Sequence, residues 1–432
     1  MKTKNKSYAL LHCNVLSGEK DMEVQKNQTI LVKDGRIESI SDTETIPEGY
    51  VCIDIKDHYV MPGLINMHVH LAGNGKPQKK QRDNAKLVNA IFSNPVSAYA
   101  AHKLVESYAK MELMSGVTTI RTVGGLKDLD TRVRDDINAG KILGPRILAS
   151  NLGISVEGGH MAGSVALPAH SAKETVEMVD ARDKENVDLI KLMITGGVMD
   201  AKEKGVPGQL KMPAEMVKAA CEEAHRKGYI VAAHVESPIG VRVALENGVD
   251  SIEHGAKPDE EIISLFKEKH AFLTTTLSPA LPYALFDRSV SNASEVEQYN
   301  GNVVFEGIRD CAKAAIANNI PVALGNDVGC PWISQYDFWR ELCYFHKYVG
   351  VSNAFALYSA TLGNATLAGI GKETGSLEPG KSADLSGCAQ NPLEDLRVLR
   401  VVEHVMIRGQ WIERPMVKRN PLLDQYLDPY LY

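Results

Sequence analysis

Short apolar runs alternate with longer amphipathic stretches from Gly63 to about Gly371, and this alternation constrains the fold more than any other feature of the chain. Eight of the runs have the pattern of strands, and two of the intervening stretches predict helices at residues 98–114 and 213–227. Strands separated by helices form parallel sheets, and eight such units close into a (β/α)8 barrel. The sequence therefore predicts an α/β barrel with strands at residues 64–70, 117–121, 146–149, 189–194, 230–234, 251–254, 272–275 and 322–326.

Polar residues stand at the ends of several of these runs, where such barrels carry their functional groups. His68 and His70 close the first run, and residues two apart in a strand project to the same side. Two imidazoles placed in this way can bind one divalent cation, such as zinc, iron or nickel. The alternative is a pair of surface or core histidines, because His-x-His is common by itself.

A lysine, Lys191, lies inside the apolar run Leu-Ile-Lys-Leu-Met-Ile and is followed by Gly196 and Gly197. An ammonium ion is costly to bury among apolar side chains, so we expect this lysine to be neutralised or modified. The alternative is a lysine at a strand edge that extends its charged end to water. The two glycines leave room for the backbone to approach a site.

Two further histidines and an aspartate complete the set. His234 and His254 each end an apolar run, with a helix expected at residues 238–247 between them. A lone histidine here would more often be a core residue, but two at successive strand ends fit the ligands of a second metal. Asp327 ends the last run, where a carboxylate can hold a metal and accept a proton from water. Its alternative role is to cap the next helix.

The run Met61-Pro-Gly-Leu-Ile-Asn-Met-His-Val-His70 resembles the amidohydrolase superfamily, whose members open their barrel with Pro-Gly-Leu-Ile-Asp-x-His-x-His. Asn66 and Asn326 depart from the usual residues without touching an expected ligand. The resemblance spans nearly the whole chain. It implies that Lys191 reacts with carbon dioxide to give a carbamate that bridges two metals. The implied ligands are His68, His70, Lys191, His234, His254 and Asp327.

The resemblance also implies a mechanism. Two divalent ions, expected to be Zn²⁺ and roughly 3.5–4 Å apart, would share a hydroxide whose pKa lies near neutrality. One ion would polarise the scissile carbonyl. Asp327 would accept the proton of the attacking water and then pass it to the leaving amine. The chain shows no Gly-x-Ser-x-Gly elbow that would supply another nucleophile.

Within the superfamily, the chain is most similar to prolidase-like dipeptidases and related carboxypeptidases. The sequences around His160, Lys191 and His234 carry this similarity. The predicted activity is cleavage of an amide bond in a dipeptide or N-acyl amino acid. The alternative is a hydrolase or deaminase of a cyclic amide or heterocycle, as in imidazolonepropionase, although that enzyme uses one metal and lacks the bridging lysine. A non-catalytic scaffold is a further alternative, but such proteins usually lose metal ligands.

Four residues are candidates for contact with the substrate. His160 follows two glycines and is expected to take part in catalysis by binding a substrate carbonyl or carboxylate, unless it is only a loop histidine. Arg121 ends the second strand and can pair with a carboxylate, although Thr122 stands where relatives often have Asp. Glu236 would meet a substrate amine or remain solvated. Cys330 either lines the pocket or packs as a small apolar residue.

In the same family, strands from both termini form a small β-sandwich, and this chain has β-like patterns at residues 8–16, 29–32, 37–40, 51–55, 375–385 and 404–412. We therefore predict a composite sandwich of residues 1–61 and 372–432 and a barrel of residues 62–371. Asp34-Gly35 predicts a hairpin turn. The sequence Ser-Gly-Cys-Ala at residues 386–389 is expected to shorten or loosen its strand. Residues 73–94, rich in Lys, Gln and Asn, are expected to form a long loop over the site.

Composition excludes several functional classes. The net charge of −6 and the absence of a basic stripe argue against a nucleic-acid partner. No apolar run approaches the length of a membrane span, and the N-terminus is too polar for a signal peptide. Seven scattered cysteines fit reduced thiols in a cytoplasm. The expected protein is a cytoplasmic enzyme for a small-molecule or dipeptide substrate, and its relatives suggest a homo-oligomer.

Overall fold

The computed structural model describes residues 6–43, 45–77 and 83–431, and the chain forms two compact units. The first contains Met1–Asn66, Lys110–Ile120 and Tyr336–Tyr432, and the second contains Met67–Ala109 and Arg121–Gln335. The domain boundaries at residues 61 and 372 remain a prediction.

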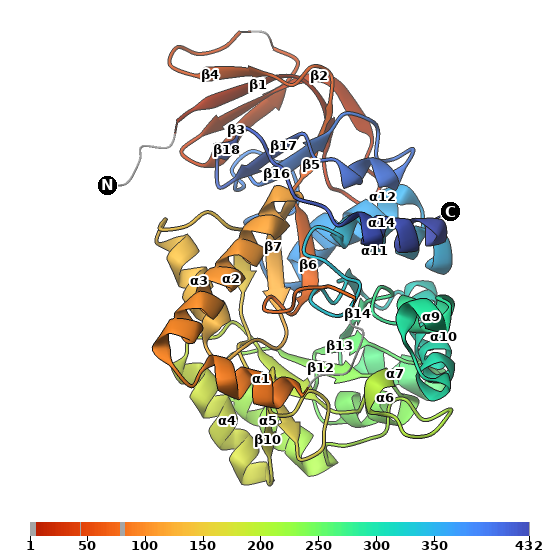
Figure 1. Ribbon diagram of the computed structural model, residues 1–432. Coiled ribbons are helices and arrows are strands. Elements are labelled where there is room, and N and C mark those ends of the chain that lie inside the picture. Colours follow the sequence, from red (N-terminus) through yellow and green to blue (C-terminus); the bar gives the residue numbers. More distant parts are fainter. Residues whose placement is uncertain (1–5, 44, 78–82, 432) are drawn as a thin grey trace. The chain divides into compact units, whose positions relative to one another are not determined.

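The first unit contains a mixed sheet built from strands of both termini (Figure 1), which confirms the predicted pairing of the two ends of the chain. Its order is β18-β17-β16-β5-β1-β2-β3, and β4 pairs with β1 outside this path. β1 is antiparallel to β2 but parallel to β4 and β5. The strands are β1 (Tyr8–Leu16), β2 (Val24–Lys33), β3 (Arg36–Ser41), β4 (Val51–Asp54), β5 (Tyr59–Pro62), β16 (Leu385–Cys388), β17 (His404–Ile407) and β18 (Gln410–Ile412).

The predicted hairpin turn is confirmed. Lys33 pairs with Arg36, and the two residues between them, Asp34 and Gly35, have φ values of 50° and 83°. Positive φ at both central residues is the requirement of the tight turn that matches the twist of the strands, and Asp-Gly meets it at little cost.

The expectation that residues 386–389 would loosen their strand is wrong for residues 386–388, and the strand ends at Cys388, before Ala389. Ser386 pairs with Met61 of β5 on one side and with Val405 of β17 on the other, and all of β16 is buried. Backbone hydrogen bonds to two neighbours hold a central strand whatever its side chains. The small residue is in fact required at Gly387, since a Cβ there would lie 2.9 Å from the carbonyl oxygen of Tyr59.

The parallel strands of a TIM-type barrel are present, as predicted, and most of them belong to the second unit, while β6 and β7 begin in the first. β10-β9-β11-β12-β13-β14-β15 form one sheet and β6-β7-β8 another, and hydrogen bonds join them at both sides. Asp188 N donates to Ala149 O at 2.7 Å, and Asp327 N donates to His68 O at 3.0 Å. The strands are β6 (Leu64–Val69), β7 (Val117–Thr122), β8 (Arg146–Leu148), β9 (Gly153–Val156), β10 (Ala166–Ala169), β11 (Ile190–Met193), β12 (Val231–Val235), β13 (Ser251–His254), β14 (Phe272–Thr275) and β15 (Val322–Leu324).

Helices accompany these strands: α4 packs against β10, α5 and α6 pack against β12, and α4 to α7 follow one another as neighbours outside these strands (Figure 1). The helices are α1 (Asn84–Ile91), α2 (Pro95–Met114), α3 (Leu129–Asn138), α4 (Ala172–Lys184), α5 (Ala214–Arg226), α6 (Pro238–Glu246), α7 (Glu260–Glu268), α8 (Leu281–Leu285), α9 (Arg288–Ser291), α10 (Glu295–Ala317), α11 (Phe338–Tyr344), α12 (Asn353–Tyr358), α13 (Asn364–Leu367) and α14 (Pro421–Leu427). Short 3₁₀ or π segments are η1 (Val198–Asp200), η2 (Phe345–Val349), η3 (Ser359–Gly363), η4 (Leu396–Arg400) and η5 (Asp428–Tyr430).

Helix α1 corrects the prediction of an uninterrupted loop at residues 73–94, of which residues 78–82 lie outside the described part of the chain. The Asp83 side chain caps this helix by accepting a hydrogen bond from Lys86 N at 3.0 Å. Leu87, Val88 and Ile91 place apolar groups on one side of the helix, a spacing that the polar composition of the segment conceals. Within the described ranges, no helix is both long and apolar enough to cross a membrane.

Candidate metal and catalytic site

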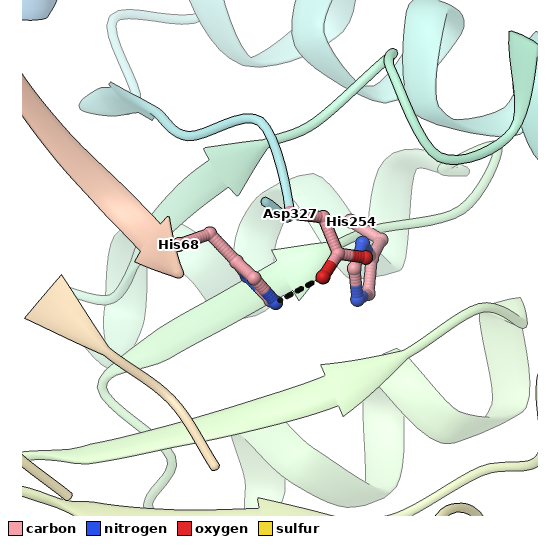
Figure 2. A group of neighbouring side chains, drawn as sticks. All are labelled: His68, His254 and Asp327. Atoms are coloured by element: carbon pink, nitrogen blue, oxygen red, sulfur yellow. Dashed lines mark ion pairs between the residues drawn. The ribbon is translucent and has the colours of Figure 1, made fainter. Parts of the chain in front are cut away.

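Three predicted ligands from separate strands converge in the second unit. His68 lies on β6, His254 ends β13, and Asp327 follows β15 (Figure 2). Each offers a ligand atom within 4.8 Å of the others. Asp327 Oδ1 lies 3.4 Å from Nε2 of His68 and 3.3 Å from Nε2 of His70. The ends of the first and last barrel strands therefore bring two imidazoles and a carboxylate together.

The backbone turns two of these side chains inward. His254 has φ 69° and Asp327 has φ 58°, values in the left-handed region that non-glycine residues seldom adopt. Each such residue costs about 1–3 kcal/mol and persists where the surroundings impose it, most often at functional sites. In regular strand alternation, His254 would face away from the side that Glu253 occupies. The left-handed conformation lets both residues reach the barrel interior.

Hydrogen bonds fix the orientation of the first two histidines. His68 Nδ1 lies 2.6 Å from Glu253 Oε2, and His70 Nδ1 lies 2.8 Å from the carbonyl oxygen of Gly124. Both partners are acceptors, so each Nδ1 carries the hydrogen and each Nε2 keeps its lone pair. The two Nε2 atoms that face Asp327 are thus the ones able to bind a cation.

Glu253 connects this site to Arg121, which is 1% exposed. Arg121 Nη2 donates to Glu253 Oε1 at 2.7 Å, and its Nε donates to the carbonyl oxygen of Met67 at 2.7 Å. Burial by itself would raise the pKa of Glu253, but Arg121 and His68 hold it well below its usual range. Because its guanidinium is committed to these buried groups, Arg121 is placed to hold Glu253 and not to meet a substrate carboxylate.

The remaining histidine ligand lies on the next strand. The His234 ring is 4.7 Å from the His254 ring, and His234, Glu236 and His254 form a second group of possible ligands within 4.8 Å. His234 Nε2 lies 3.3 Å from the carbonyl oxygen of Gly196 and donates to it. That bond leaves Nδ1 as the lone-pair nitrogen of His234.

Lys191 lies on β11 in the interior of the barrel, 1% exposed. In the described part of the chain, its Nζ has no hydrogen-bond partner. Burial lowers the pKa of Lys191 to about 8, although Glu253 and Asp327 act against that shift. A buried amine without a partner is costly, so the protein must neutralise it or supply a bound group.

His160 stacks on a predicted ligand. Its ring is 4.1 Å from that of His234 and nearly parallel to it, at 6°. Nδ1 lies 2.6 Å from Asp200 Oδ2, and Asp200 also accepts from Gly197 N at 2.8 Å. Burial would raise the pKa of Asp200, but the hydrogen bond from His160 lowers it. A Cβ at Gly197 would be 3.1 Å from His160, which agrees with the expectation that the glycines allow close approach.

A cavity of about 70 Å³ adjoins these groups and is lined by His160, His234, Glu236, Tyr283 and Asp327, among others. Glu236 Oε2 has no hydrogen-bond partner among the residues described. Burial raises the pKa of Glu236 to about 8, and Asp327 and Asp200 add to this effect. Cys330 also lines the cavity, and burial raises the pKa of its thiol well above the usual value.

The donor set suits a divalent metal. Burial lowers the pKa of His68 to about 4 and those of His234 and His254 well below the usual value. Burial would raise the pKa of Asp327, but the histidines around it hold that pKa well below its usual range. Neutral imidazoles and an ionised carboxylate are the states that bind Zn²⁺ and similar ions.

Two residues that hold the predicted site residues in place were missed from the sequence. Glu253 directly precedes His254, and Asp200 lies three residues after Gly197. Glu253 carries a signal in the sequence Ser-Ile-Glu-His, since a carboxylate inside a buried strand needs a partner. Asp200 has no comparable signal in the sequence, because its partner His160 is distant in the chain.

Comparison with known proteins identifies the family of the chain. The sequence pattern of the Amidohydrolase family matches residues 59–412. The crystal structure of a Bifidobacterium longum protein described as a prolidase has a TM-score of 0.87 and 37% identity, and the match covers 99% of each chain. A Xaa-Pro dipeptidase with methionine bound in its active site has a TM-score of 0.82 and 28% identity, over 94% of this chain and 100% of that one.

A curated relative extends the comparison to another activity. Ochratoxinase from Aspergillus niger is 27% identical over 453 aligned positions, which cover 93% of this chain and 88% of the relative. The family match spans the barrel strands and β16, β17 and β18, the described strands that follow the barrel. The chain is a member of the amidohydrolase family and a hydrolase of C–N bonds.

Proposed function

We propose that the protein is a binuclear metal-dependent amidohydrolase that cleaves the amide bond of a dipeptide or N-acyl amino acid. The observation that carries this proposal is the buried group of His68, His254 and Asp327, together with the Lys191 amine in the barrel interior, which has no hydrogen-bond partner among the described residues. Similarity to a Xaa-Pro dipeptidase and to a protein described as a prolidase supports the substrate class.

The residues present can hold two ions. His68 and His70 would bind the first, His234 and His254 the second, and Asp327 would also act as a ligand. Two divalent ions, which we propose to be Zn²⁺, would polarise the scissile carbonyl and activate a water at neutral pH. We propose that the Lys191 Nζ lone pair bonds to the carbon of CO₂ and that the nitrogen then releases a proton. A carbamate formed in this way would offer two oxygens as metal ligands.

Asp327 is proposed to move the proton. Its carboxylate would accept a proton from the attacking water and donate it to the nitrogen of the leaving amine when the C–N bond breaks. The histidines keep this carboxylate ionised before the reaction, as its lowered pKa indicates. No serine or cysteine nucleophile is required.

The cavity residues are proposed to bind the substrate. We propose that His160 acts in its doubly protonated form, with Nδ1 donating to Asp200 and Nε2 donating to a substrate carbonyl or carboxylate oxygen. Glu236 would meet a substrate amine, since its Oε2 has no partner among the described residues. Arg121 is proposed to position Glu253. A cytoplasmic homo-oligomer is proposed as the working form, and the free cysteines fit a reducing compartment.

A substrate library tests this proposal. Zinc-loaded protein is incubated with dipeptides and N-acyl amino acids, and released amino acids are measured by chromatography, with chelator-stripped protein as the control. We expect metal-dependent release from a subset that shares one type of C-terminal residue. Silence across the whole library with two metals bound would overturn the proposal and favour a cyclic amide or heterocycle as substrate.

A further inference from the structure

The loop at residues 197–211 carries Asp200 and forms part of the wall of the cavity of about 70 Å³ that is proposed to bind the substrate. Its first residues, 197–199, line that cavity. A backbone hydrogen bond of 2.9 Å from Gly196 N to the carbonyl oxygen of Gln209 closes the base of the loop. The position of the loop therefore sets both the shape of the cavity and the place of Asp200.

The outer part of this loop surrounds open space. A separate cavity of about 260 Å³ lies there, and all of its described lining residues belong to the range 200–211. Four of the lining side chains are charged: Asp200, Lys202, Glu203 and Lys211. A segment that encloses space and charged groups gains little stability from its own packing. The loop consequently depends on contacts with other elements to keep its conformation.

Asn300 of α10 (Glu295–Ala317) provides such a contact and is 0% exposed. Its Nδ2 donates to the carbonyl oxygen of Glu203 at 2.8 Å, and its Oδ1 accepts from Gly205 N at 2.7 Å. One amide thus satisfies a donor and an acceptor of the loop backbone, as a neighbouring strand would. Gly205 has φ 84°, so the side chain of Asn300 holds a turn that favours glycine.

The helix that carries Asn300 is a firm support for the loop. α10 is 23 residues long, and Ser294 and Glu297 form a capping box at its N-terminus. The helix packs against η1 (Val198–Asp200) and against α8 (Leu281–Leu285). A Cβ on Gly301 would overlap the Cβ of Tyr283, which itself lines the substrate cavity. α10 is therefore placed to hold two parts of the wall of that cavity.

We propose that Asn300 is a positioning residue, which holds the loop so that Asp200 orients His160 for substrate binding. The inference rests on the proposed function, in which His160 contacts the substrate. Asn300 is not among the described residues that line the cavity, so it acts through the loop. Only two residues separate Asp200 from Glu203, so a shift of the anchored turn is passed on to Asp200. Displacing a positioning group by about 1 Å can lower a rate by about 10²-fold.

Substitution of Asn300 tests this role. Asn300→Ala removes both hydrogen bonds, and Asn300→Asp keeps the acceptor but puts an oxygen in place of the donor. We expect KM for the best amide substrate to rise about fivefold in both variants, with kcat within about twofold of wild type. Asn302→Ala, at an exposed residue of the same helix, should match wild type. Asn300→Ala should add little to the KM of Asp200→Asn, because both changes release His160.

Two measurements on the zinc-loaded protein do not require turnover. Hydrogen exchange followed by mass spectrometry should be roughly tenfold faster at residues 197–208 in Asn300→Ala than in wild type. Modification of His160 by diethyl pyrocarbonate should be roughly threefold faster in Asn300→Ala and in Asp200→Asn, but unchanged in Asn302→Ala. The exposed His170 is the internal reference, and its modification rate should be the same in all four proteins.

The outcomes separate this inference from the proposed function. Wild-type exchange and wild-type modification of His160 in Asn300→Ala would overturn the inference. A loss of stability with unchanged KM would show that Asn300 is only structural, and this would overturn the positioning role while leaving the proposed function standing. Absence of turnover with every amide, in wild type as well, would count against the proposed function. The modification rate of His160 would then decide whether Asn300 positions that ring.

Discussion

His68 donates a hydrogen bond of 2.6 Å from Nδ1 to Glu253, and both side chains are at most 1% exposed. Glu253 is held in turn by Arg121 at 2.7 Å. These contacts fix the tautomer of His68, so that its Nε2 keeps a lone pair and faces Asp327. A carboxylate behind a ligating histidine typically contributes 10–100-fold to metal affinity.

Replacing Glu253 by Gln should therefore weaken metal binding by about 10–100-fold, because the amide no longer provides an anion to His68. It should also destabilise the fold by about 3 kcal/mol, since Arg121 loses a buried ionic partner. Competition with a chelating dye measures the affinity, and urea unfolding measures the stability. The exposed Glu157→Gln is the matched control. Unchanged metal affinity in Glu253→Gln would show that His68 needs no such support.

Lys191→Ala should reduce the bound metal from two ions per chain to one or none, because the bridging carbamate cannot form. Elemental analysis of the purified protein measures this ratio. Wild-type protein treated with ¹³C-labelled bicarbonate should give a carbamate carbon signal in NMR that the variant lacks. Lys173→Ala, at a lysine side chain that is 86% exposed, should keep both the metals and the signal. Two ions in Lys191→Ala would refute the bridge.

Asp200→Asn tests the positioning of His160. The neutral amide cannot pair with an imidazolium, so His160 loses its anchor and substrate binding should weaken. We expect KM to rise about tenfold with little change in kcat or metal content. The double variant with His160→Gln should be no worse than His160→Gln alone, because the two residues act as a unit. Strictly additive effects of the two substitutions on KM would contradict this coupling between Asp200 and His160. Asp21→Asn, which changes an exposed residue, serves as the control.

A histidine pair in the first unit predicts a pH effect on stability. His58 Nδ1 lies 3.0 Å from His404 Nε2. Burial lowers the pKa of His404 to about 4, and the charges of His58 and Lys56 contribute to this shift. Between pH 6.5 and 4, His404 binds a proton in the unfolded chain but not in the folded one. The stability that neutral His404 contributes to the fold is therefore present above pH 6.5 and is lost as the pH falls toward 4.

The full pKa shift of His404 corresponds to roughly 3 kcal/mol of unfolding free energy. Because the side chain is partly exposed, we expect His404→Gln to remove only about 1 kcal/mol of the stability that wild type loses as the pH falls. Urea unfolding of both proteins at several pH values across this window measures the difference. The exposed His170→Gln should follow the wild-type profile. Parallel profiles for wild type and His404→Gln would rule out the effect.

The barrel was predictable because its signal is local. Apolar runs bounded by polar residues located eight of the ten parallel strands described, and β13 (Ser251–His254) and β14 (Phe272–Thr275) match their predicted bounds. Strand ends of a parallel barrel meet at one face, so His68, His254 and Asp327 could be expected to converge.

The remaining features depend on information that is not local. The left-handed φ of His254 lets it face inward beside Glu253, and a sequence does not display this conformation. The pairing of His160 with Asp200 joins two loops. Strands β9 (Gly153–Val156) and β10 (Ala166–Ala169) were not predicted, because β9 begins with a glycine and β10 contains a proline, and both residues weaken a strand pattern. Helix α1 has a clear cap in Asp83, but the polar composition around it favoured a loop.

Asp327→Asn provides the most direct test of the central claim, that amide hydrolysis depends on proton transfer by this carboxylate within a metal-binding group. Turnover of the best amide substrate and the metal content are measured together for the variant, wild type and Asp21→Asn. The account predicts that kcat falls by about 10³-fold in Asp327→Asn while the bound metal remains. Turnover within tenfold of wild type would contradict it.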